Sequence, residues 1–153
     1  MSAYAAELQT DGKTVVFTNG CFDLIHRGHI ELLRSAKSEG NVLLVGVNGD
    51  ESVRGLKGSG RPILAEQDRA VIIDALEMVN HVTLFHDESP LSLIVKLRPD
   101  VLVKGSDYGA DEIVGGAEVN SWGGRVVTVP LIEGHATRSI IQNIAAGASG
   151  EKG

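Results

Sequence analysis

The stretch TVVFTNGCFDLIHRGH, residues 14–29, contains both a strand signal and a helix signal. Residues 14–18 are β-branched or aromatic and almost continuously apolar, which is typical of a strand covered on both faces of its sheet. After a polar turn, apolar residues recur at three- and four-residue spacing, which predicts a helix over residues 28–39. A buried strand that leads into a helix indicates the start of a unit with parallel strands.

The same alternation continues along the rest of the chain. Four more short, β-branched runs predict strands, and four more stretches with a helical period predict helices. The strands are expected at residues 42–47, 82–85, 100–103 and 125–129, and the helices at 64–76, 89–97, 113–122 and 137–146. Such an order requires right-handed crossovers, so the sequence predicts an α/β fold: a single-domain, Rossmann-like, doubly wound parallel sheet of about five strands with flanking helices. The domain is expected to span residues 1–146, with a frayed tail at 147–153.

Composition and charge exclude several classes of protein. The chain has 153 residues, of which 42% are hydrophobic and 22% charged, as in ordinary globular domains. Its net charge of -6 removes the positive field that nucleic-acid binders and anionic-membrane binders use, so neither partner is expected. The single cysteine, Cys21, excludes an intramolecular disulfide. The sequence shows no signal-peptide pattern and no apolar run of membrane-spanning length, so a cytoplasmic location is expected.

Polar and glycine-rich segments follow four of the predicted strands. Ligands of open parallel sheets bind beyond the carboxyl ends of the strands, so binding residues are expected within 19–29, 48–61, 104–108 and 130–138. The first of these loops has no G-x-G-x-x-G, and the chain has no G-x-x-x-x-G-K-[ST]. An anionic ligand would therefore need a different phosphate-binding device.

Two histidines three residues apart are the candidates for that device. His26 and His29 flank Gly28 at the start of a predicted helix, so their side chains share one face. Gly28 has no Cβ to obstruct a phosphate, and the helix N-terminus supplies free backbone N–H groups. Two imidazoles there can hydrogen-bond a polyphosphate and stabilise the charge that develops on it. Two alternatives remain: a metal site, although helical zinc pairs usually lie four residues apart with a third ligand, or simple capping and packing of the helix.

The motif G-x-F-D-x-x-H-x-G-H at residues 20–29 resembles the signature of the cytidylyltransferase-like nucleotidyltransferases. The resemblance continues through residues 45–54, 56–62, 68–69 and 98–116, and covers nearly the whole chain from 14 to 144. Within that superfamily the chain is most similar to the D-glycero-β-D-manno-heptose 1-phosphate adenylyltransferases, mainly over residues 100–116. The resemblance implies transfer of AMP from ATP to a heptose 1-phosphate, giving ADP-heptose and pyrophosphate without a covalent enzyme intermediate. It also implies Mg²⁺ as the cofactor that accompanies ATP, and a homodimer.

The resemblance further implies roles for individual residues. The implied catalytic residues are His26, His29 and Lys57, and Lys57 is expected on a glycine-rich loop that closes on the phosphates. The implied nucleotide-binding residues are Asn19, Gly20, Phe22, Gly28, Arg69, Thr137 and Arg138. The implied substrate-binding residues are Asp23, Asp50, Lys104, Gly105 and Asp107. Lys104 would meet the sugar phosphate, and Asp23 would either orient His26 or help to bind Mg²⁺; no metal ligand is assigned.

Some of these residues have a second interpretation. Lys57 is also compatible with a solvated loop lysine, and Asp50 with a helix cap. Arg69 is also compatible with a surface ion pair to Glu66 or Asp68.

The last loop departs from the family pattern, which has a Ser-Thr-Thr run at the start of the final helix. Here only Thr137 matches, and Ala136 and Arg138 replace hydroxyl residues, so a guanidinium is expected to take over part of the phosphate contact. Two other functions share these features: a CTP-dependent cytidylyltransferase for a small polyol or alcohol phosphate, and a non-catalytic nucleotide-binding module.

Overall fold

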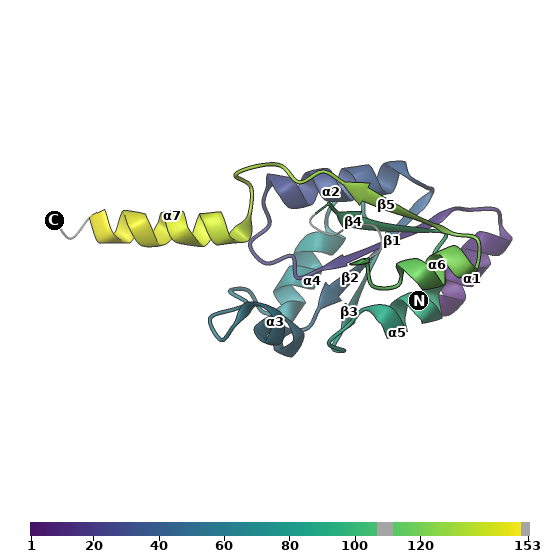
Figure 1. Cartoon of the computed structure of the whole chain (residues 1–153), viewed down its shortest axis with the longest axis horizontal. Coiled ribbons are helices and arrows are strands. Elements are labelled where there is room, and N and C mark those ends of the chain that lie inside the picture. The colour runs from purple at the N-terminus through teal and green to yellow at the C-terminus, as the bar shows by residue number, and fades with distance from the viewer. Residues whose placement is uncertain (107–111, 151–153) are drawn as a thin grey trace.

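The computed structural model describes residues 1–106 and 112–150, and within them helices and strands alternate along the chain (Figure 1). The predicted Asp107 lies outside the described residues. The strands are β1 (Val15–Gly20), β2 (Val42–Asn48), β3 (His81–Phe85), β4 (Val101–Gly105) and β5 (Arg125–Val129). The helices are α1 (Ser2–Thr10), α2 (Arg27–Ser38), α3 (Asp50–Lys57), α4 (Glu66–Asp74), α5 (Leu91–Leu97), α6 (Gly116–Ser121) and α7 (Thr137–Gly150).

The strands form one parallel sheet in the order β3-β2-β1-β4-β5. Strand β1 is central, and its Phe17 is paired with Leu44 of β2 on one side and with Leu102 of β4 on the other. The chain first builds outward through β2 and β3, then returns to place β4 and β5 on the opposite side of β1. This reversal creates a topological switch point between β1 and β4, where crevices open in folds of this kind. The predicted α/β architecture and all five predicted strands are confirmed.

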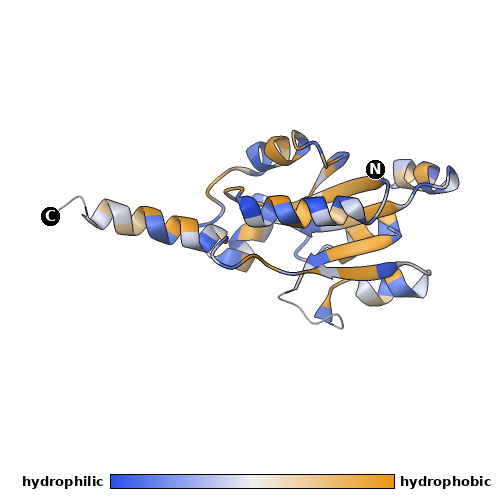
Figure 2. Ribbon diagram, turned by 90° about the horizontal axis from the view of Figure 1, so that it is seen from above, coloured by the Kyte–Doolittle hydropathy of each residue, from blue (hydrophilic) through white to orange (hydrophobic). Residues whose placement is uncertain are grey.

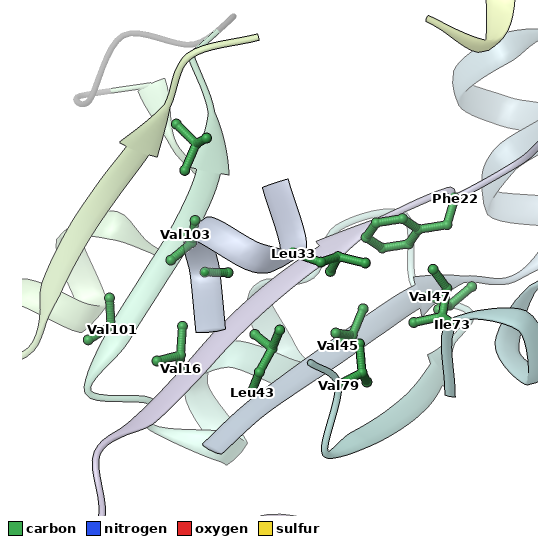
Figure 3. Close-up of a cluster of buried hydrophobic side chains, with 12 residues drawn as sticks. Val16, Phe22, Leu33, Leu43, Val45, Val47, Ile73, Val79, Val101 and Val103 are labelled. Carbon is green, nitrogen blue, oxygen red and sulfur yellow. The ribbon is translucent and has the colours of Figure 1, made fainter. Parts of the chain in front are cut away.

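Each face of the sheet carries its own hydrophobic core, because successive residues of a buried strand point to opposite faces. One core joins the sheet to α2 and α4 and includes Val16, Leu33 and Val103 (Figure 3). The other joins it to α1, α5 and α6 and includes Phe17 and Leu102. Figure 2 shows the result: the strands are largely hydrophobic, and the helices alternate between hydrophobic and hydrophilic residues.

Two helices lie outside the predicted set. Helix α1 covers part of the second core through the fully buried Ala5. Helix α3 occupies residues 50–57, within a segment predicted as a loop. It follows Gly49 and has Asp50 and Glu51 in its first turn and Lys57 in its last, which suits the helix dipole. The alternative interpretation of Asp50 as a helix cap pointed to this helix, although no helix was predicted over the segment.

Helix α7 extends away from the sheet and has no buried residue (Figure 1). It continues to Gly150, and so includes residues 147–150 of the predicted tail. Within residues 1–106 and 112–150, no helix combines the length and the apolar character needed to cross a bilayer.

The two-core arrangement predicts where a truncation destabilises the fold. Leu33 of α2 is 0% exposed, so Leu33→Ala should lower the free energy of unfolding by about 3 kcal/mol. Val71 of α4 is 68% exposed, so Val71→Ala should change it by less than about 0.5 kcal/mol. Urea denaturation followed by circular dichroism measures both, and equal midpoints for the two variants would contradict this assignment of the core.

Candidate active site

A cavity of about 510 Å³ opens at the switch point between β1 and β4. Its walls come from the loop after β1, the end of β4, the end of α3, the loop before α5 and the segment before α6. Most of the predicted site residues line it together: Asn19, Gly20, Phe22, Asp23, His29, Lys57, Lys104, Gly105 and Thr137. The structure therefore brings residues from four separate parts of the chain to one place.

The two histidines are held by backbone N–H groups at the N-terminus of α2. The Gly28 N–H donates to Nδ1 of His26 at 3.0 Å, and the His26 N–H donates to Nδ1 of His29 at 3.3 Å. Because each Nδ1 is an acceptor, each neutral ring carries its proton on Nε2. The rings stack with their centroids 3.8 Å apart. The histidines thus cap the helix, as one alternative expected, and each still has an Nε2–H donor that the cap does not use.

Burial keeps both rings neutral near pH 7. It lowers the pKa of His29 to about 4, with a further contribution from His26. Burial and the neighbouring His135 also lower the pKa of His26 below its ordinary value. The described residues contain no group of three or more His, Cys, Asp or Glu side chains that could hold a metal ion. The arrangement therefore suits two neutral hydrogen-bond donors that face an anion.

Gly28 is required by the protein's own packing. A Cβ at this position would lie 2.8 Å from the backbone oxygen of His135 and 2.9 Å from Cε1 of His26. Residue 28 must therefore be glycine for the loop before α7 and the His26 ring to approach α2 this closely. This reason differs from the predicted one, which was space for a phosphate.

Asp23 binds protein groups with both oxygens of its carboxylate. Arg61 Nε and the Ile63 N–H donate to Oδ2 at 2.9 and 2.7 Å, and the Leu64 N–H donates to Oδ1 at 3.0 Å. Burial by itself raises the pKa of Asp23, but these donors outweigh it and hold the pKa below its usual value. The backbone oxygen of Asp23 accepts from the Thr137 hydroxyl at 2.6 Å. Asp23 thus joins the loop after β1 to the segment after α3 and to the start of α7.

Arg69 is fully buried behind the cavity and does not line it. Its guanidinium donates to three backbone oxygens, those of Cys21, Asn48 and Leu64, and to Oδ1 of Asp50 at 2.9 Å. The ion pair is therefore with Asp50, and not with Glu66 or Asp68 as the alternative interpretation expected. Arg69 and Asp50 position backbone around the cavity without lining it.

Two lysines supply positive charge at the cavity from opposite directions. Lys57, at the end of α3, is exposed, and Gly58 follows it with a φ of +102°, which favours glycine. Lys104, at the end of β4, donates to the backbone oxygen of Asn19 at 3.3 Å. Burial lowers the pKa of Lys104 to about 8, so its amine is still mostly charged at pH 7.

Three other predicted residues lie outside the cavity lining. His26 and Gly28 contribute through the start of α2, as described above. Arg138 is exposed in the first turn of α7 and does not line the cavity.

Some lining residues were not predicted, including Asn48, Arg61, Glu88, Ser89 and Glu112. Glu88 and Ser89 follow β3. The rule that ligands bind beyond the carboxyl ends of parallel strands applies to this loop as it does to the loops after the other strands. Arg61 lies in a segment that was singled out, but nothing in its local sequence identifies Asp23 as its partner.

Asp23 should contribute mainly to stability. Asp23→Asn replaces a charged acceptor of three hydrogen bonds with a neutral amide, so the free energy of unfolding should fall by about 2 kcal/mol. Asp11→Asn, at an exposed position, is the matched control and should change it by less than about 0.5 kcal/mol. Chemical denaturation at pH 7 measures both, and an unchanged midpoint for Asp23→Asn would show that these bonds contribute nothing.

The lowered pKa of His29 predicts a pH-dependent stability. The unfolded chain binds a proton at His29 below about pH 6.5, and the folded chain does so only near pH 4. The contribution of neutral His29 is therefore fully present above pH 6.5 and is lost as the pH falls toward 4. Comparing urea midpoints at pH 7 and pH 5 should show a smaller loss for His29→Gln than for the wild type; equal losses would refute the shift.

The comparisons with known proteins agree with this geometry. The sequence model of the family described as Cytidylyltransferase-like matches residues 17–140. The protein called Bifunctional protein HldE is 50% identical over 135 residues in Methylobacillus flagellatus and 50% identical over 141 residues in Magnetococcus marinus. These alignments cover 88% and 92% of this chain but only 28% and 29% of the relatives, so the chain spans less than a third of their length.

Solved structures show the same fold. A lipopolysaccharide core biosynthesis protein from Thermoplasma volcanium superposes with a TM-score of 0.65 at 30% identity, covering 79% of this chain and 98% of that one. A pantoate-β-alanine ligase from Francisella tularensis superposes with a TM-score of 0.57 at 13% identity, over 83% of this chain and 63% of that one, which supports the fold alone. With its matching family model, its signature at the start of α2 and its cavity at the switch point, the chain belongs to the cytidylyltransferase-like family and is a nucleotidyltransferase domain.

Proposed function

We propose that the protein transfers AMP from ATP to D-glycero-β-D-manno-heptose 1-phosphate, giving ADP-heptose and pyrophosphate. The observation that carries the proposal is that His29, which stacks on His26 at the start of α2 and keeps an unused Nε2–H donor, lines the same cavity as Lys104 at the end of β4. The choice of acceptor is supported by the 50% identity to Bifunctional protein HldE and by the likeness to a lipopolysaccharide core biosynthesis protein.

The reaction needs alignment and charge stabilisation more than proton transfer. In the proposed mechanism the triphosphate lies at the N-terminus of α2, where the imidazoles of His26 and His29 donate to it through Nε2 and the helix dipole favours its negative charge. An oxygen of the sugar phosphate forms a bond to the α-phosphorus, and the bond from that phosphorus to the β-phosphate bridging oxygen breaks. Lys57 at the edge of the cavity neutralises part of the charge on the departing pyrophosphate.

We propose that Mg²⁺ enters with the triphosphate, which supplies oxygen ligands of the kind this ion prefers. The described residues do not form a dedicated cage, because the carboxylate of Asp23 binds protein donors and no cluster of three acidic, histidine or cysteine side chains is present among them.

We also propose a cytoplasmic homodimer. The dimer is an expectation from the family, and the exposed apolar side chains Val71 and Ile144 are compatible with contact between subunits. The location is supported by the single cysteine, which suits a reducing compartment.

The proposal predicts both a substrate preference and an effect of His29. Pyrophosphate release should be fastest with ATP and heptose 1-phosphate in a panel of ATP and CTP against sugar, polyol and alcohol phosphates. His29→Ala should lower kcat by about 100-fold or more while changing ATP affinity much less, because the imidazole acts mainly on the developing charge.

His81→Ala is the matched control, since His81 is exposed at the start of β3, and its kcat should stay at the wild-type value. Faster turnover with CTP and a small polyol phosphate would replace the proposed activity with a cytidylyltransferase. Absence of pyrophosphate release from every pair would indicate a nucleotide-binding module.

A further inference from the structure

The two faces of the sheet present different chemistry to the cavity. Along β1, Val16 belongs to the core on the α2 face and Phe17 to the core on the α5 face, so Asn19 points to the α5 face. A Cβ on Gly46 would lie 3.3 Å from both the Asn19 Cβ and a Leu93 methyl of α5, which supports the same placement. By the same alternation Lys104, two residues after Leu102, lies on the α5 face. The histidines of α2 therefore belong to one face of the sheet, and Asn19 and Lys104 to the other.

The side-chain amide oxygen of Asn19 has no hydrogen-bond partner in the described part of the chain, although it is buried. The residue is only 8% exposed, and its Oδ1 is fully buried. Exchanging the amide oxygen and nitrogen would leave a buried polar atom unpaired in the same position. Buried polar side-chain atoms in native proteins are nearly always hydrogen-bonded, so an orphan that lines a cavity indicates a bond completed by a ligand.

The surroundings of this amide identify the kind of ligand. The backbone oxygen of Asn19 accepts from Lys104 Nζ, so the orphan amide and the ammonium are neighbours. The loops on this side of the cavity also bring Glu88, Ser89 and Glu112 to its wall. Two carboxylates disfavour a triphosphate, but they accept hydrogen bonds from hydroxyl groups. An ammonium and several hydrogen-bond acceptors in the lining of one cavity suit a ligand with one phosphate and several hydroxyls.

We infer that Asn19 and Lys104 form the acceptor subsite, in which Lys104 binds the phosphate and the buried amide of Asn19 accepts a hydrogen bond from one hydroxyl of the sugar. This inference rests on the proposed function and assigns Asn19 to the acceptor instead of the nucleotide. It makes Asn19 a specificity-determining residue, because a site built to bond a hydroxyl rejects analogues that lack it. The triphosphate and the acceptor then occupy opposite faces of the sheet and meet at its edge.

The test compares wild type with Asn19→Ala in calorimetric binding and in turnover. The probes are heptose 1-phosphate, its single-deoxy analogues, inorganic phosphate and ATP. We expect Asn19→Ala to weaken heptose 1-phosphate binding about 10-fold or more, and to leave the affinities for inorganic phosphate and ATP within about twofold. One deoxy analogue should bind wild type about 10-fold more weakly than heptose 1-phosphate does, and this difference should disappear in Asn19→Ala. Asn120→Ala, at an exposed position on α6, is the matched control and should behave as wild type.

Other outcomes separate the inference from the proposed function. Weaker ATP binding with unchanged heptose 1-phosphate binding, or a deoxy penalty that persists in the variant, would overturn the acceptor subsite. Asn19-dependent binding of the sugar phosphate without pyrophosphate release would contradict the proposed activity and support the subsite. If wild type binds none of the phosphorylated sugars, both are overturned. If Asn19→Ala does not fold, Asn19→Ser, which keeps a shorter hydrogen-bonding group, gives the same comparison.

Discussion

The buried guanidinium of Arg69 is the interaction on which the geometry of the site depends. The segments after β1 and β2 leave the sheet at its carboxyl edge, so their carbonyl groups need partners from elsewhere in the protein. Arg69 donates to the carbonyls of Cys21 and Asn48, and so connects the ends of the two neighbouring strands. Its pairing with Asp50 also fixes where α3 begins, and α3 carries Lys57 at its other end. A guanidinium suits this task because its five donors are held in a rigid plane.

The fold was predictable because each strand is a short β-branched run and helices separate the strands. This signal is local, and it placed every strand end within two residues of the observed one. It did not reveal α3, whose eight residues are mostly polar, or α1, which contributes a single fully buried residue. The site was predictable as a location, because the carboxyl ends of adjacent parallel strands must meet at one edge.

The roles of the charged residues were harder to predict, since a side chain's partners are set by tertiary structure. Arg69 lies in the polar stretch Glu66-Gln67-Asp68-Arg69, which in isolation is typical of a helix surface. Its burial appears only when α4 packs beside the ends of β1 and β2. Asp23 is likewise part of the motif at residues 20–29, which does not reveal the hydrogen-bond partners of its carboxylate. The structure shows that these partners lie about forty residues later, at Arg61, Ile63 and Leu64. Local patterns therefore identified the segments that line the cavity better than they identified what individual side chains contact.

The division of the cavity between the two faces of the sheet has a stereochemical consequence. When a nucleophile approaches phosphorus from one side and the leaving group departs from the other, the configuration at phosphorus is inverted. In the proposed arrangement, histidine donors on the α2 face would bind the triphosphate, and Lys104 and Asn19 on the α5 face would bind the acceptor across the edge of β1 and β4. A chirally labelled α-phosphate would accordingly leave such a site with its configuration inverted. The doubly wound sheet would then determine the configuration of a chirally labelled product as well as the place where the product forms.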